Sequence, residues 1–468
     1  MDEQREPHED LDRWLQARID PLPPPPGTFD LIRRRVRRRR YRQVAVSAAV
    51  AAAVAAAVVV VPRVATSVLN VNQNPASNGA AAARSATPSA PYQQGANKAP
   101  GGASESKAAS PAPTSPAPVP ANFAPTSATF IGLHTGWVIG QAGTPGHCST
   151  QYCTSVARTT NAGQTWSGVP APLTGAPDGG SGVSQIRFLN GADGWAFGPE
   201  LFATTDGGQH WANEGTGGQR VTDLETAGDR AFAVRASCTG TGTDFAVSCT
   251  SYSLYSTLAG QDDWAPVPGA TGLAGGPGGS ASLVLTGTQG YLLAPDGSVY
   301  AGPIDGTGSW QQVSSSPAGG ASCSPGTAQA SGQPSGAFLA AASATSLVLA
   351  CGRPSAAGSG AAVFTSSDGG KAWQQAGTAP KAAVTAAAAQ PSGEIVLATT
   401  DGIQVSRDGG SSWQASQLGP TGPAGGFSWV GMTSNDQGIA IAADSSRHQL
   451  WLTFDGGRSW QPSAVSGS

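Results

Sequence analysis

The chain has 468 residues, more than a single ordinary hydrophobic core supports, so several regions are expected. Its 26 Lys and Arg residues and 29 Asp and Glu residues give a formal net charge of −3, which excludes a strongly basic or strongly acidic chain. The charge is nevertheless uneven. Residues 1–43 hold 11 of the basic residues, whereas residues 123–468 hold 11 basic and 20 acidic residues.

Residues 1–43 are predicted to form a basic cytoplasmic tail. Four apolar side chains would share one face of a short helix over residues 10–19, where a cytoplasmic partner could dock: Leu11, Trp14, Leu15 and Ile19. The alternative is a small solvated tail. The arginine run at 33–42 invites a nucleic-acid interpretation, but it directly precedes an apolar segment. Retention on the cytoplasmic side and contact with anionic lipid explain it more simply, so no nucleic-acid partner is expected.

Residues 44–61 contain no charged side chain and are predicted to form a transmembrane signal anchor. Eighteen residues in a helix span ~27 Å, which is just enough for the hydrocarbon core of a bilayer. A cleaved signal peptide is the alternative, but the preceding charged region is long and no Ala-x-Ala site follows Pro62. The arginine excess predicts a single-pass protein of the cell membrane, with its N-terminus in the cytoplasm and the remainder outside.

Residues 62–122 are predicted to be a disordered linker. They are rich in Ala, Pro and Ser and have few large apolar residues, as in the segment from Ser110 to Pro120. Such a stalk would hold the following domain away from the membrane. The sequence leaves glycosylation of its Ser and Thr residues open.

The pattern Ser/Thr-x-Asp-x-Gly-x-x-Trp recurs through residues 123–468. An Asp or Asn side chain can accept a backbone hydrogen bond and close a tight turn, and the glycines allow the positive φ that such a turn needs. The Trp begins the returning strand and buries a large area. Five copies carry the acid or amide and the Trp at the expected positions: Asn161 and Trp166, Asp206 and Trp211, Asp368 and Trp373, Asp408 and Trp413, and Asp455 and Trp460.

Two weaker copies, Asp305 to Trp310 and Thr257 to Trp264, fill the gaps and complete seven Trp landmarks. The landmarks are separated by 45, 53, 46, 63, 40 and 47 residues, each close to one four-stranded propeller blade. Short apolar runs opened by glycine, such as Gly136-Trp-Val-Ile, precede most copies, and no stretch shows a sustained helical period. We therefore predict that residues 123–468 form an all-β, seven-bladed β-propeller, with six or eight blades as alternatives.

These repeats resemble the Asp boxes of BNR-repeat β-propellers. The layout of residues 185–211 is most similar to the photosystem II assembly-factor-like group, and the resemblance covers roughly residues 126–468. It implies a binding scaffold with arginine-rich surface patches, although this propeller has only nine arginines. The Ala, Gly and Pro content suggests an actinobacterial source.

All six cysteines lie in the predicted exported domain and arrive in three local pairs: Cys148 and Cys153, Cys238 and Cys249, and Cys323 and Cys351. An even count in an oxidising location predicts three disulfides. Zinc binding is the alternative, because His147 lies beside Cys148. The absence of a second His-rich cluster favours disulfides, so no metal or other cofactor is expected.

Sialidases are also BNR propellers, which makes a catalytic site worth testing. Such a site needs three arginines, a Tyr–Glu pair and an Asp, but no Arg-Ile-Pro motif precedes the first box and no Glu is evidently partnered by Tyr. The predicted inner strands carry few reactive groups besides Arg187, Asp223 and Glu225. Asp223 and Glu225 alternate along one strand and form a weak candidate catalytic pair, with a solvated strand face as the alternative.

The sequence thus favours a membrane-anchored extracytoplasmic scaffold that binds an unknown protein or glycan and has no enzymatic activity. Two alternatives remain open. The first is an extracytoplasmic glycoside hydrolase, and the second is a transmembrane sensor that signals through its cytoplasmic tail.

Overall fold

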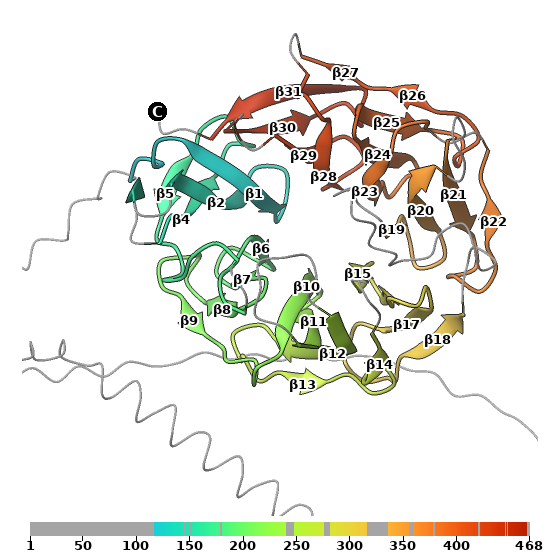
Figure 1. The fold of residues 1–468 in the computed structure, drawn as a ribbon, viewed down its shortest axis with the longest axis horizontal. Helices are drawn as coiled ribbons and strands as arrows, with labels where there is room; N and C mark the ends of the chain where they lie inside the picture. Colours follow the sequence, from blue (N-terminus) through green and yellow to red (C-terminus); the bar gives the residue numbers. More distant parts are fainter. Residues whose placement is uncertain are drawn as a thin grey trace, which may run out of the picture. The chain divides into compact units, whose positions relative to one another are not determined.

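Seven sheets form a ring and confirm the prediction of an all-β, seven-bladed propeller (Figure 1). The computed structural model describes residues 117–144, 147–148, 152–177, 180–239, 248–275, 281–315, 336–354, 360–377, 380–419, 422–444, 446 and 448–465. The predicted tail and anchor and most of the predicted stalk lie outside these residues. Within the described residues, no helix is long and apolar enough to cross a bilayer.

The first three blades follow one another along the chain. Blade 1 contains β1 (Phe123–Phe130), β2 (Gly136–Thr144), β3 (His147–Cys148), β4 (Thr154–Thr159) and β5 (Ser167–Val169). Blade 2 contains β6 (Gln185–Phe188), β7 (Gly194–Phe197), β8 (Leu201–Thr204) and β9 (Ala212–Asn213). Blade 3 contains β10 (Arg220–Ala227), β11 (Arg230–Thr239), β12 (Ser248–Leu258), β13 (Ala265–Pro266) and β14 (Leu273–Ala274).

The remaining four blades repeat the same antiparallel order. Blade 4 contains β15 (Ser282–Leu285), β16 (Gln289–Leu293), β17 (Val299–Pro303) and β18 (Gln311–Ser314). Blade 5 contains β19 (Ala337–Ala341), β20 (Leu347–Pro354), β21 (Ala361–Ser366) and β22 (Gln374–Gln375). Blade 6 contains β23 (Val384–Ala389), β24 (Ile395–Thr399), β25 (Gly402–Ser406) and β26 (Gln414–Ala415). Blade 7 contains β28 (Phe427–Met432), β29 (Gly438–Ala442), β30 (Gln449–Thr453) and β31 (Ser459–Ala464), and β27 (Gln417–Leu418) pairs with β31 in parallel.

All seven Trp landmarks lie where the last two main strands of a blade meet, and five of these turns share one hydrogen-bond pattern. In blade 6, the Ser406 hydroxyl donates to Asp408 Oδ1 (2.9 Å) and accepts from the Gly410 N–H (2.7 Å). The Ser412 N–H also donates to Asp408 Oδ1 (2.8 Å). The turns that contain Asn161, Asp206, Asp368 and Asp455 repeat these three bonds.

The two weaker copies depart from this pattern. Asp305 Oδ1 accepts from the N–H and hydroxyl of Thr307, at 2.9 and 2.7 Å, and so closes a shorter turn. In blade 3, the Thr257 hydroxyl accepts from the Asp263 N–H (3.0 Å). In blade 4, Pro303 stands where the five full copies have a Ser or Thr hydroxyl, and in blade 3, Ala259 stands where they have Asp or Asn, so the full network cannot form in either copy.

The glycines that open second strands make room for side chains of the first strands. Gly194 lies opposite Phe188, and a methyl group on Gly194 would fall 2.5 Å from the Phe188 ring. The same ring meets Trp211 edge-on, with 6.2 Å between ring centroids. In blade 1, Phe130, Gly136 and Trp166 repeat this arrangement. The loose glycine repeat in the sequence is therefore a packing requirement.

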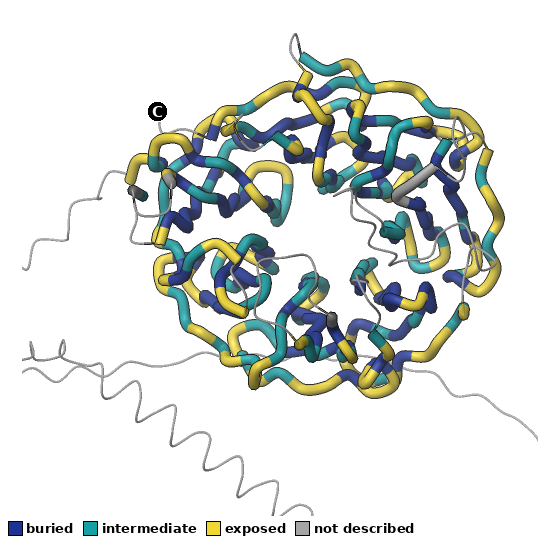
Figure 2. Tube along the Cα trace, in the orientation of Figure 1, coloured by how far each residue is buried: buried dark blue, intermediate teal, exposed yellow. Residues whose placement is uncertain are grey.

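The hydrophobic core lies between adjacent blades, where the middle strands are buried (Figure 2). Blades 1 and 7 close the ring through one such cluster, which includes Val119, Trp166 and Leu452. Polar contacts support this closure, because the Gln437 side-chain amide donates to the Leu133 carbonyl (3.0 Å). Non-covalent packing therefore joins the two ends of the propeller.

Two predicted disulfides are confirmed. Cys148 and Cys153 close the loop between β3 and β4, and Cys238 pairs with Cys249 across β11 and β12. The third predicted pair contains Cys323, which lies outside the described residues. Cys351, in β20, is itself disulfide-bonded.

Candidate functional site

The centre of the ring contains a cavity of about 680 Å³. The inner strands of all seven blades line it: β1, β6, β10, β15, β19, β23 and β28. Most lining residues are small, aliphatic or aromatic, in agreement with the apolar inner strands expected from the sequence. Among the described lining residues, only Arg187, Asp223 and Glu225 carry ionisable groups. The chemistry of the cavity therefore depends on these three side chains.

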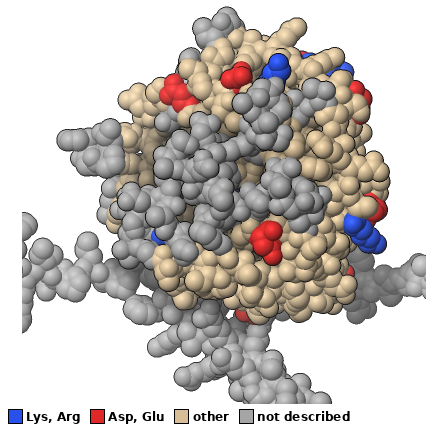
Figure 3. Space-filling view, turned by 45° about the vertical axis from the view of Figure 1, so that its right-hand side comes forward, with Lys and Arg blue, Asp and Glu red and all other residues tan. Residues whose placement is uncertain are grey.

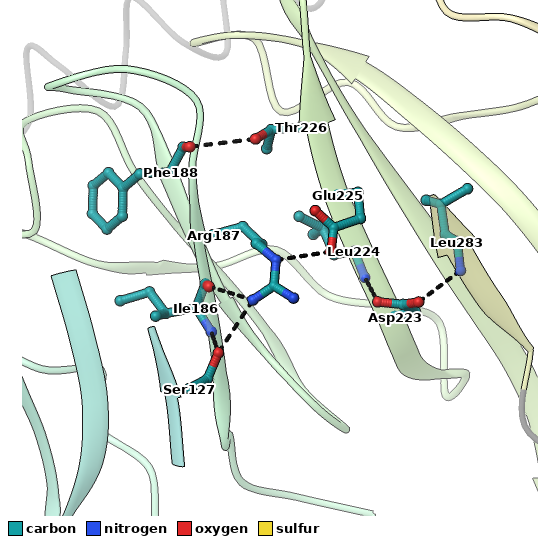
Figure 4. A network of polar contacts seen from close by, with 9 residues as sticks. All are labelled: Ser127, Ile186, Arg187, Phe188, Asp223, Leu224, Glu225, Thr226 and Leu283. Atoms are coloured by element: carbon teal, nitrogen blue, oxygen red, sulfur yellow. Dashed lines mark hydrogen bonds and ion pairs between the residues drawn. The ribbon is translucent and has the colours of Figure 1, made fainter. Parts of the chain in front are cut away.

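Arg187 joins three blades at the cavity wall. Its neighbours in β6, Ile186 and Phe188, are buried in the core between blades 1 and 2, so strand alternation directs Arg187 toward blade 3. The guanidinium Nε donates to Glu225 Oε1 in blade 3 (2.9 Å), and Nη1 donates to the Ser127 hydroxyl in blade 1 (3.2 Å) (Figure 4). The Arg187 side chain is only 10% exposed. This arginine is thus a buried cation neutralised by Glu225.

Asp223 joins blade 3 to blade 4. One carboxylate oxygen accepts from the Leu224 N–H (2.9 Å) and the other from the Leu283 N–H of β15 (2.7 Å). A register irregularity between Val221 and Asp223 interrupts the pairing of β10 with β11 at this point. Such irregularities bend a strand and redirect its side chains.

The pKa of Asp223 is raised to about 7. Burial at the cavity wall is the main cause, and the negative charge of Glu225 is the second. The N–H donors of Leu283 and Leu224 and the charge of Arg187 oppose this rise. Asp223 therefore takes up or loses a proton near neutral pH, whereas Glu225 is held in an ion pair with Arg187.

The structure places both predicted acids on β10 and on the cavity wall. Glu225 turns toward Arg187 of blade 2, whereas Asp223 turns toward the backbone of blade 4 (Figure 4). Together with Ser127, these contacts form a polar chain across four consecutive blades. The sequence indicated that Arg187, Asp223 and Glu225 lie on inner strands, but it gave no signal for the contacts with Ser127 and Leu283.

A second buried arginine, which sequence reasoning missed, lies between blades 2 and 3. Arg235 is 7% exposed, and its guanidinium lies 4.4 Å from the ring centroid of Tyr255 and 5.3 Å from that of Trp264. Burial lowers the pKa of Arg235. Its Nε and Nη2 atoms have no hydrogen-bond partner in the described part of the chain, and the guanidinium interacts with the two aromatic faces and with the charge of Glu214.

Charged groups are sparse elsewhere. On the face in Figure 3, the described acidic and basic residues are few and scattered. Within the ranges that the structure describes, no group of three or more His, Cys, Asp and Glu side chains is placed to hold a metal ion.

No family model and no curated protein sequence matches this chain. Among solved structures, it is similar to one described as YCF48 bound to D1 peptide, with 16% identity, coverage of 73% of this chain and 95% of that chain, and a TM-score of 0.45. A structure of YCF48 from Cyanidioschyzon merolae shows 15% identity, coverage of 64% and 88%, and a TM-score of 0.43. A GH74 enzyme from Niastella koreensis shows 12% identity, coverage of 74% and 66%, and a TM-score of 0.35. At these identities and TM-scores, the likenesses assign neither a family nor an activity to the chain.

Proposed function

We propose that the protein is a membrane-anchored, extracytoplasmic β-propeller that serves as a non-catalytic scaffold for a protein or glycan. The anchor over residues 44–61 and the stalk after it remain predictions from the sequence. The proposal for the propeller itself is supported by the contacts of the ionisable groups at the central cavity.

The observation that carries the proposal is the polar chain through Ser127, Arg187, Glu225, Asp223 and Leu283. Each ionisable member is bonded to a neighbouring blade, as expected of groups that fix the position of one blade against the next. A hydrolase needs at least two groups that converge on one bond of a substrate. Asp223 and Glu225 instead face different blades, which favours a structural role for both.

The first test of the proposal is an assay for enzymatic activity. The full chain, purified with its disulfides intact, is expected to show no turnover above background on panels of glycosides, sialosides and esters. Asp223→Asn and Glu225→Gln are the matched variants, because each keeps the size of the side chain and removes the acid. Turnover that disappears in either variant would establish a hydrolase in place of the scaffold.

A glycoside hydrolase is the second candidate, and one observation favours it. Asp223 has a pKa raised to about 7 by burial and by the neighbouring Glu225. A carboxyl group with a pKa near neutral can act as a general acid or base in the hydrolysis of a glycosidic bond. The substrate panels therefore include polysaccharides and are assayed from pH 5 to pH 8, the range that covers the titration of Asp223.

The proposed location is tested separately. A phosphatase reporter fused after Pro120 is expected to be active, and one fused after Gln43 is expected to be inactive. The reverse result would place the propeller in the cytoplasm. Crosslinking followed by affinity purification of the full chain from native membranes is expected to recover a partner that purified chain then binds directly.

A further inference from the structure

The central cavity contains a hydrogen-bond donor that the contacts between blades leave free. Arg187 uses Nε for Glu225 Oε1, and it uses Nη1 for the Ser127 hydroxyl and the Ile186 carbonyl. Its Nη2 atom has no partner among the described residues, although the side chain is only 10% exposed (Figure 4). A buried N–H group without an acceptor is costly, so Nη2 is placed to donate to a group that enters the cavity.

Free acceptor atoms lie on the same cavity wall. In the described part of the chain only Oε1 of Glu225 is bonded, and this side chain is 29% exposed, so Oε2 can accept a hydrogen bond from a ligand. Each oxygen of Asp223 accepts one N–H, from Leu224 or from Leu283, and a carboxylate oxygen can accept two hydrogen bonds. The bonds to neighbouring blades fix these groups before a ligand arrives, which lowers the entropic cost of binding.

The charges at the cavity favour an uncharged ligand. Glu225 neutralises Arg187, and Asp223 adds a negative charge when it is ionised, which disfavours an anion such as the carboxylate of a sialoside. An ammonium group only donates hydrogen bonds and would leave Arg187 Nη2 unpaired. A hydroxyl group both donates and accepts, so neutral hydroxyl groups match the free atoms of this wall.

Other blades supply apolar and aromatic surface. Blades 5 and 6 line the cavity mainly with Ala and Leu side chains and with the half-buried Phe338. In blade 7, Trp429 is also half-buried, and its ring centroid lies 5.8 Å from the guanidinium carbon of Arg187. A methyl group on Gly431 would lie 2.4 Å from the Trp429 ring, so this glycine leaves room for the ring along the inner strand.

The size of the cavity is also suitable for a ligand. Pockets for small ligands typically measure about 300–1,000 Å³, and this cavity measures about 680 Å³. A sugar ring carries hydroxyl groups at its edge and C–H groups on its faces. It therefore matches both the polar wall of blades 2 and 3 and the apolar surface of blades 5 to 7.

We propose that the central cavity binds sugar units of a neutral glycan and holds them without cleavage. Arg187 Nη2 donates to one hydroxyl group, and Glu225 Oε2 and Asp223 accept hydrogen bonds from others. Trp429 and Phe338 contact the C–H faces of the sugar rings. This inference rests on the scaffold function proposed above and names a neutral glycan as the ligand of the scaffold.

The first experiment screens the full chain, with its disulfides intact, for sugar binding by saturation-transfer NMR. The probes are the methyl glycosides of glucose, galactose, mannose and N-acetylglucosamine and their oligosaccharides, with sialic acid as the anionic comparator. At least one neutral sugar is expected to bind and to be recovered uncleaved, whereas sialic acid is expected not to bind.

Calorimetry with the sugar that binds then tests the residues. Glu225→Gln keeps an oxygen for Arg187 but turns the free acceptor into a donor, so affinity is expected to fall about tenfold or more. Trp429→Leu is also expected to weaken binding. Its matched control is Phe454→Leu, which removes an aromatic ring that is 57% exposed and lies outside the cavity, and which is expected to leave affinity unchanged.

Deoxy analogues of the bound sugar test the same contacts without changing the protein. At least one analogue that lacks a single hydroxyl group is expected to bind about tenfold more weakly, and full affinity for every analogue would contradict the proposed hydrogen bonds. Unchanged melting temperatures of the variants exclude unfolding as the cause of lost binding.

Four outcomes overturn the inference. Tighter binding of sialic acid than of any neutral sugar would contradict the charge argument, and full affinity of both Glu225→Gln and Trp429→Leu would place the sugar elsewhere. Cleavage of the bound sugar that is lost in Glu225→Gln would establish a hydrolase. If no sugar binds but a protein without glycan is recovered from native membranes and binds directly, the inference fails and the scaffold function stands. Recovery of neither ligand would remove both.

Discussion

Blades 4 and 6 differ both in the turn that precedes the landmark tryptophan and in how deeply that tryptophan is buried. In blade 6, the turn before Trp413 has the full network of Ser406, Asp408 and Gly410, and Trp413 is only partly buried. In blade 4, Asp305 closes a shorter turn, yet Trp310 is 1% exposed. The blade with the weaker turn has the more deeply buried tryptophan.

The glycines of blade 4 explain this difference. Methyl groups on Gly290 and Gly302 would lie 2.4 and 2.1 Å from the Trp310 ring, so both glycines are needed for the ring to enter the blade. The indole N–H also donates to the Pro303 carbonyl (3.3 Å). The full turn network also occurs with deeply buried tryptophans, at Trp166 (2% exposed) and Trp460 (0%), so the space that neighbouring residues leave for the ring, and not the turn, sets the depth of burial.

The largest effect is expected from Trp310→Ala. Removing this buried ring should lower the free energy of unfolding by ~3–5 kcal/mol, because a large cavity remains between blades 3 and 4. Trp413→Ala is the matched variant and should cost less, since that ring is partly exposed. Chemical denaturation of both variants measures the difference. Equal losses of unfolding free energy would show that the different burial of Trp310 and Trp413 does not affect their contribution to stability.

A smaller effect is expected from Ser406→Ala in blade 6. The change leaves the buried Gly410 N–H without its acceptor and should cost ~1–3 kcal/mol. Asp305→Ala in blade 4 serves as the control and should have a smaller effect, because its turn is exposed and short. Thermal unfolding measures both. A greater loss of stability for Asp305→Ala would contradict the inference that the turn contributes more to the stability of blade 6 than to that of blade 4.

The contributions to stability of the central cavity and of the turns that contain the repeated Asp or Asn should also depend on pH in different ways. The folded pKa of Asp223 is about 7, whereas its ordinary value is 3.8. Between these values the folded state holds more protons than the unfolded state, so stability should fall as pH rises from about 5 to 8. Asp223→Asn should remove this dependence while it keeps an acceptor for the Leu283 N–H. A wild-type stability that rises over this range would contradict the assignment.

The smallest effect is expected at Asp408, and it has the opposite sign. Hydrogen bonds from the Ser412 hydroxyl and N–H and from Ser406 lower the pKa of Asp408 from 3.8 to about 2. The unfolded state therefore holds more protons in this range, and the contribution of Asp408 should be lost as pH falls from about 4 toward 2. Asp408→Asn should weaken this acid sensitivity. Unfolding curves measured between pH 2 and pH 5 would show the change, and identical curves would contradict it.

The sequence was sufficient for features that depend on residues close together in the chain. The box turns use donors and acceptors within five residues of one another, so the spacing of Ser406, Asp408 and Gly410 already specifies the turn. The seven tryptophans each mark one blade, because a four-stranded meander needs a nearly constant length of chain. The disulfides Cys148–Cys153 and Cys238–Cys249 were predictable for the same reason, since each closes a short loop within one blade.

The tertiary structure alone decided which side chains meet between blades. Glu225 is 38 residues from Arg187 and Leu283 is 60 residues from Asp223, and no repeat in the sequence relates these positions. Their contacts depend on the rotation of one blade against the next and on the irregular pairing of β10 before Asp223. The approach of Gly175 to the Tyr152 carbonyl likewise depends on two connections that meet at one rim. Sequence periodicity specifies which side chains of a strand lie on the same face of its blade. The packing of the blades in the closed ring determines which of these faces contact each other.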